Sequence, residues 1–140
     1  MKNFKTILIV TLILDVIQVI PLLIAKAGSA MKDQMISDFN IDGLAESAPA
    51  LEVMDIMLHI FGYVFLGLVI SVIYSLRLKT KEALKSATFI LFIVHLFWTL
   101  PDFVTLAQGG SAHPPIIIMV LTLIPVVGLF YVSQNGELKS

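Results

Sequence analysis

Four long apolar stretches dominate this sequence and restrict its fold more than any other feature. They cover about residues 6–25, 51–76, 87–107 and 115–132. Each matches the roughly 20 mostly apolar residues that a helix needs to cross about 30 Å of hydrocarbon. Backbone groups have no water partner in lipid, and the stretches lack the period-two alternation of barrel strands. The sequence therefore predicts an all-α integral membrane protein, with one four-transmembrane-helix bundle over residues 1–140.

Composition narrows the possible functions. Hydrophobic residues make up 58% of the chain and charged residues 14%, outside the usual range of soluble domains. The chain has no cysteine, which excludes disulfides, thiolate nucleophiles and cysteine-ligated iron–sulfur clusters within it. A net charge of −1 provides no electrostatic footprint for nucleic acid. The expected partner is the lipid bilayer, and no nucleic-acid partner is predicted.

The basic residues predict the orientation, because Lys and Arg favour cytoplasmic loops. Those on one side of the predicted spans are Lys2, Lys5, Arg77, Lys79, Lys81, Lys85 and Lys139. Only Lys26 and Lys32 fall on the other side, in a long acidic loop. Both termini are therefore predicted to be cytoplasmic.

The first apolar stretch also resembles a signal peptide, whose cleavage near Ala27 or Ala30 would leave three spans. Basic residues precede it, and small residues surround Lys26. However, the stretch is longer than a typical apolar region of about 7 to 15 residues, and Asp15, Gln18 and Pro21 interrupt it. We expect it to be retained as the first transmembrane helix.

The three predicted connections differ in kind. Residues 26–50 place apolar side chains every three to five positions, which favours a short amphipathic helix at the outer surface; a disordered loop is the alternative. Residues 77–82 predict a tight basic cytoplasmic hairpin. Residues 108–115 contain two glycines and two prolines, which are typical of a defined outer turn before a helix.

Polar residues inside the spans are the candidates for a functional site, because an ionisable side chain there costs about 2.5 to 3.5 kcal/mol. Asp15 and Gln18 share one face of the first span. The second span carries one polar stripe, made of Glu52, Asp55, His59 and Tyr63. The third span carries another, made of His95, Trp98 and Asp102. Because the two helices run in opposite directions, both stripes occupy the outer half of the bilayer. The pattern predicts a polar pocket that opens outward.

Asp15 is the hardest of these residues to explain as a purely structural group, because it lies near the middle of its span. A lone carboxyl at that depth stays neutral unless a partner stabilises its charge. The estimated depths place His95 close to the same level. His95 is therefore the candidate partner.

Three chemistries fit this set of residues. A quinone or another lipophilic small molecule would use Asp15, Gln18, His59, Tyr63, His95 and Trp98, with Phe97 along its body. Metal or haem ligation would use Asp55, His59, His95 and Asp102, although their spacing matches no specific motif. A proton pathway would use Asp15, His95 and His59. No catalytic residue is assigned, and enzyme activity stays open.

The opposing interpretation is a structural or assembly protein, in which the same polar groups only form hydrogen bonds between helices. Its partners would be another membrane-complex subunit or further copies of the chain.

The segment LHIFGYVFLGLVI over residues 58–70 and the segment HLFWTLPDFVTLAQGGSAHPP over residues 95–115, together with the order of four spans, resemble the DoxX-like group of small bacterial membrane proteins. The resemblance implies a location in the bacterial cytoplasmic (inner) membrane. It also implies an accessory redox or quinone-facing role. It transfers no catalytic residue to this chain.

Overall fold

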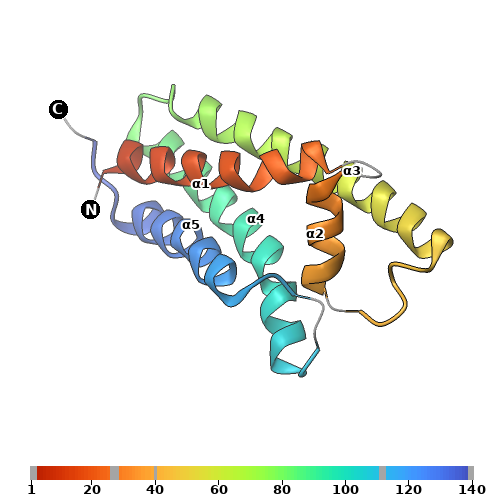
Figure 1. The fold of residues 1–140 in the computed structure, drawn as a ribbon. Helices are drawn as coiled ribbons and strands as arrows, with labels where there is room; N and C mark the ends of the chain where they lie inside the picture. The colour runs from red at the N-terminus through yellow and green to blue at the C-terminus, as the bar shows by residue number, and fades with distance from the viewer. Residues whose placement is uncertain (1–2, 26–28, 40, 111–112, 139–140) are drawn as a thin grey trace.

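The computed structural model describes residues 3–25, 29–39, 41–110 and 113–138 (Figure 1). The described residues form five helices and no strand: α1 (Phe4–Ile24), α2 (Ala30–Phe39), α3 (Ala48–Ser75), α4 (Lys81–Ala107) and α5 (Ile116–Asn135). Lys2, Lys26, Ala27 and Lys139, which entered the predictions of orientation and cleavage, lie outside the described residues.

Four of these helices, α1, α3, α4 and α5, are long and apolar enough to cross a membrane. Most of their large apolar side chains face outward rather than into the core, as a lipid-exposed surface requires. The predicted all-α, four-helix membrane bundle is confirmed. The protein is a multi-pass membrane protein whose apolar faces contact the bilayer.

Side-chain caps move two helix starts from their predicted positions. The Thr80 hydroxyl accepts a hydrogen bond from the Ala83 N–H, so α4 begins at Lys81 rather than near residue 87. Lys81 and Lys85 consequently lie in the first turns of α4 and not in the connection. Ser47 caps α3 in the same way through the Ala50 N–H. Because α4 begins at Lys81, the connection between α3 and α4 is shorter than the sequence predicted.

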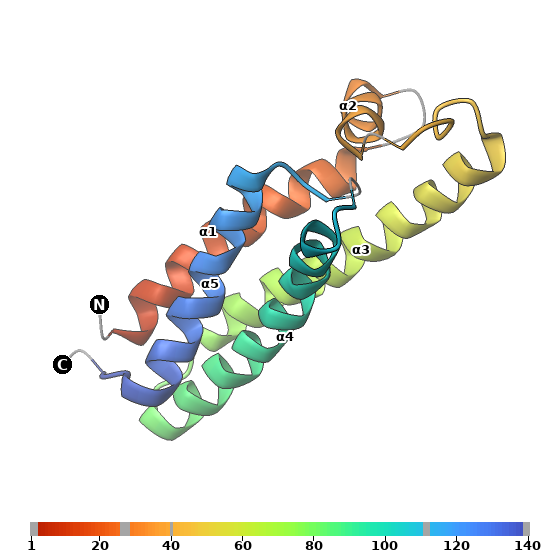
Figure 2. The same cartoon turned by 90° about the horizontal axis from the view of Figure 1, so that it is seen from below.

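The helices are arranged with α1 between α3 and α5 (Figure 1), while α4 packs mainly against α5 and little against α3. The start of α1 and the end of α5 lie at the same end of the bundle as the α3–α4 turn (Figure 2). Gly136 follows α5 and leaves no room for a side chain beside the Phe4 ring. Both described ends of the chain therefore lie on one side of the membrane domain.

The long connection between α1 and α3 contains the helix α2, which confirms the amphipathic-helix alternative over the disordered loop. This helix lies across the bundle axis, at the end opposite to the termini (Figure 1). Its Lys32 is buried, while Asp33 and Gln34 are exposed. The structure thus places α2 as a cap on one end of the four-helix bundle.

Candidate functional site

The two central ionisable residues, Asp15 and His95, meet inside the bundle. The His95 Nε2 atom lies 3.0 Å from the Asp15 Oδ1 atom. Asp15 is fully buried, and His95 is 4% exposed. Each lies within about one residue of the middle of its helix, α1 and α4, respectively. Because α1 and α4 otherwise touch little, this contact is a polar bridge across the core of the membrane domain.

The positions of the protons in this pair follow from the second hydrogen bond of His95. The His95 Nδ1 atom lies 2.7 Å from the carbonyl oxygen of Leu91. A carbonyl oxygen only accepts hydrogen bonds, so Nδ1 must carry a proton and donate it. The Nε2–Oδ1 contact then shares one further proton, either on the imidazole or on the carboxyl group. The Asp15–His95 pair is neutral as a whole in both cases, with one proton shared between Nε2 and Oδ1.

Two buried oxygen atoms next to the pair have no hydrogen-bond partner among the described residues: Asp15 Oδ2 and Thr11 Oγ1. Both side chains are fully buried, and they lie one helical turn apart on the same face of α1. An unsatisfied buried polar atom costs about 1 to 3 kcal/mol, so native proteins rarely leave two such atoms close together without a binding partner. Sequence reasoning missed Thr11, although its position four residues before Asp15 was the available signal.

Trp98 and Gln18 lie near the pair but are occupied by other contacts. The Trp98 ring packs edge-on against Phe65, with centroids 4.3 Å apart, and against Phe61, at 5.3 Å. The Gln18 side chain donates to the Leu14 carbonyl oxygen of its own helix, at 3.4 Å. Trp98 therefore forms one packed wall near the pair, and the hydrogen bond of Gln18 is made within its own helix.

His59 and Tyr63 are not brought to this site. Both are exposed on the outer face of α3, and 68% of Tyr63 is accessible. The side of α3 that faces the bundle is occupied instead by apolar residues such as Leu58 and Phe65. The polar stripe predicted for this helix thus does not meet the Asp15–His95 pair.

The four weak candidates for metal ligands are also not brought together. Among the described residues, no group of three or more His, Asp or Glu side chains lies close enough to hold a metal ion. Both ring nitrogens of His95 are engaged, and His59 lies on the outer face of α3. The described residues therefore offer neither a metal site from Asp55, His59, His95 and Asp102 nor a pair of axial haem ligands.

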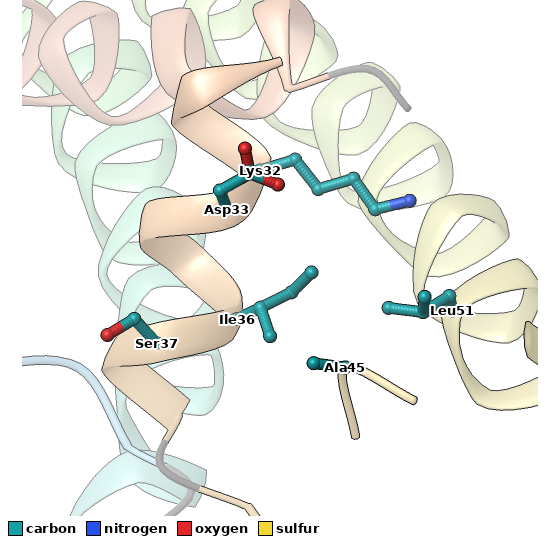
Figure 3. A pocket seen from close by; sticks show the side chains of 6 residues that line it. All are labelled: Lys32, Asp33, Ile36, Ser37, Ala45 and Leu51. Carbon is teal, nitrogen blue, oxygen red and sulfur yellow. The ribbon is translucent and has the colours of Figure 1, made fainter. Parts of the chain in front are cut away.

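Asp55 has a partner that the sequence did not predict. The Lys32 Nζ atom lies 2.6 Å from Asp55 Oδ1, and the lysine side chain is only 7% exposed. Figure 3 shows Lys32 extending from α2 toward α3, across a hollow of about 430 Å³ that Ile36, Ala45 and Leu51 also line. This ion pair ties α2 to the N-terminal part of α3. Asp55 is therefore a structural anchor in this arrangement.

Comparisons of the chain with protein-family models, with curated proteins and with solved structures found no match in any of the three. The resemblance to the DoxX-like group stays a prediction from the sequence.

Proposed function

We propose that this protein binds a lipophilic small molecule with a polar head group at the Asp15–His95 pair. The observation that carries the proposal is the buried Asp15 Oδ2 atom, which has no partner among the described residues although its twin oxygen contacts His95. A ligand hydroxyl group would satisfy this atom by donating to it, because the shared proton lies in the Nε2–Oδ1 contact and leaves Oδ2 as an acceptor. The Thr11 hydroxyl group, which has no partner among the described residues, would donate to a ligand carbonyl oxygen. The pair would thus bind a ligand group that exchanges protons.

A quinone-type head group suits this chemistry best, since its oxygens alternate between carbonyl and hydroxyl forms. In this proposal the protein is an accessory subunit of a membrane redox complex in bacteria. Of the six residues predicted to bind ligand, Asp15 would contact the head group directly and His95 would hold Asp15 in position. Trp98 would shape the wall beside it, and Thr11 joins the site.

The test measures binding of a decyl-substituted benzohydroquinone, whose hydroxyl groups can donate to Asp15, in lipid nanodiscs. Trp98 is the only tryptophan of the chain and lies one helical turn from His95, so the bound hydroquinone should quench its fluorescence saturably. We expect Asp15→Asn to weaken this binding at least about tenfold, which corresponds to about 1.4 kcal/mol for one lost hydrogen bond to a charged or acidic group.

Asp42→Asn is the matched control, because it makes the same chemical change at an exposed residue outside the bundle. It should leave the dissociation constant unchanged. Equal binding by wild type and Asp15→Asn, with both proteins folded, would rule out the proposed site.

A second candidate function, membrane-complex assembly, is favoured by the outer face of α3. His59 and Tyr63 lie near the middle of this helix, where hydrocarbon provides no hydrogen-bond partner. A second membrane protein or another copy of the chain would cover both groups. Under this alternative Asp15 and His95 only join α1 to α4, and no saturable hydroquinone binding is expected in any variant.

We further propose that both termini face the cytoplasm of a bacterial inner membrane, with α2 on the outside. The absence of cysteine allows single-cysteine labelling without background. Ser37→Cys on α2 should react with a membrane-impermeant maleimide in spheroplasts, whereas Lys79→Cys in the α3–α4 turn should react only after lysis; both residues are exposed. The reverse pattern would contradict this orientation.

A further inference from the structure

A groove between α1 and α5 opens onto the surface that faces lipid. Its volume is about 460 Å³, within the range of small-molecule pockets. Ile7, Val10 and Thr11 line it from α1, and Leu123, Val127 and Tyr131 line it from α5. Val127 is 65% exposed, so this side of the groove is accessible to molecules dissolved in the bilayer.

Within the groove, α1 and α5 approach each other closely. Gly128 faces Ile7, and a Cβ atom at position 128 would lie only 3.1 Å from the Ile7 Cγ2 atom. From Leu123 to Tyr131 the wall formed by α5 extends about 12 Å, at 1.5 Å per residue. An extended alkyl or isoprenoid chain would fit along this length.

The lining determines which ligands the groove accepts. None of the described residues that line it is charged, so a charged ligand would have no counter-ion there. Thr11 lines the groove and also carries a fully buried hydroxyl oxygen without a partner among the described residues. Asp15, with its own unpartnered oxygen, follows one helical turn later on the same face. The groove therefore reaches Thr11 from the lipid side, one helical turn from Asp15.

We infer that the α1–α5 groove binds the apolar chain of a neutral lipophile and admits its polar end from the bilayer to Thr11 and Asp15. This inference rests on the proposed function and adds to it the ligand class and the entry route. The ligand is an uncharged amphiphile with a long chain and a head group that forms hydrogen bonds. It enters sideways from the membrane and not through the hollow beneath α2.

The experiment blocks the groove from either wall, with Val10→Phe on α1 and with Val127→Phe on α5. Binding of the decyl-substituted benzohydroquinone and of its methyl analogue, which carries the same head group, is measured by Trp98 quenching in nanodiscs. In both blocking variants the dissociation constant of the decyl probe should rise at least about tenfold more than that of the methyl probe. Val120→Phe is the control, because Val120 is exposed on α5 outside the groove. It should bind both probes like the wild type.

Thr11→Val tests the polar end of the groove, since it removes the hydroxyl group and keeps the size of the side chain. We expect it to weaken binding of both probes several-fold.

Unchanged binding of the decyl probe by both blocking variants would overturn the groove proposal. An equal loss of binding of both probes in these variants would also overturn it. If the blocking variants bound the decyl probe normally but Asp15→Asn lost binding, the proposed function would stand without the groove. If only the blocking variants lost the decyl probe, the groove would stand as a lipid site and the proposed head-group site would fall.

Discussion

Replacing His95 with alanine is expected to destabilise the membrane domain by about 2 to 3 kcal/mol, because it leaves both carboxyl oxygens of the fully buried Asp15 without a partner. The substitution also releases the polar bridge between α1 and α4, two helices with few other contacts. Reversible unfolding in mixed SDS micelles, followed by helical circular dichroism, measures the change.

The double variant Asp15→Leu/His95→Leu separates the cost of an unpaired group from the value of the pair. Apolar replacement of both partners leaves no buried polar group unsatisfied, so most of the lost stability should return. A double variant that unfolds more easily than His95→Ala would contradict this account. A stable double variant that no longer binds the hydroquinone would support a pair kept for ligand binding and not for folding.

Replacing Phe65 with alanine is the second change with a large expected effect. Phe65 is 1% exposed, belongs to the core cluster and packs against the Trp98 ring. Removal of a buried phenylalanine ring costs about 3 to 5 kcal/mol, since the cavity is only partly refilled. We expect a loss in this range in the same unfolding experiment, with a change in the Trp98 emission spectrum as its environment loosens.

Phe97→Ala is the matched control for this prediction. Phe97 precedes Trp98 on α4 but is 64% exposed, so it packs mainly against lipid. Its removal should change stability by less than about 1 kcal/mol. A similar loss of stability in Phe97→Ala and Phe65→Ala would show that burial inside the bundle is not what stabilises this region.

The number, type and approximate position of the spans followed from the sequence, because the bilayer sets the length of each span and requires its backbone to form hydrogen bonds within one helix. The errors lie at the helix ends. Thr80 and Ser47 start α4 and α3 earlier than hydropathy indicated, since a side-chain cap acts on backbone geometry and not on polarity. The sequence contained these caps, but an apolar count does not detect them.

The candidate site could be predicted only in part. The similar depths of Asp15 and His95 were readable from their distances to the span ends, and the structure brings these two residues together. The rotation of α3 was not readable. Apolar residues cover all sides of such a helix, so no single face is marked as the inner one, and His59 and Tyr63 turn outward. The pairing of Lys32 with Asp55 was equally hidden, because it depends on where α2 folds back.

The sequence by itself determined that this chain is a four-helix membrane protein with a carboxyl and an imidazole group near its middle. That conclusion rests on local physics, namely the length of the apolar stretches and the cost of polar groups in lipid. Only the tertiary structure decided which polar groups meet, which oxygens of Asp15 and Thr11 have no partner among the described residues and where a groove reaches Thr11. These features depend on the rotation and packing of whole helices, which side-chain fit sets after insertion.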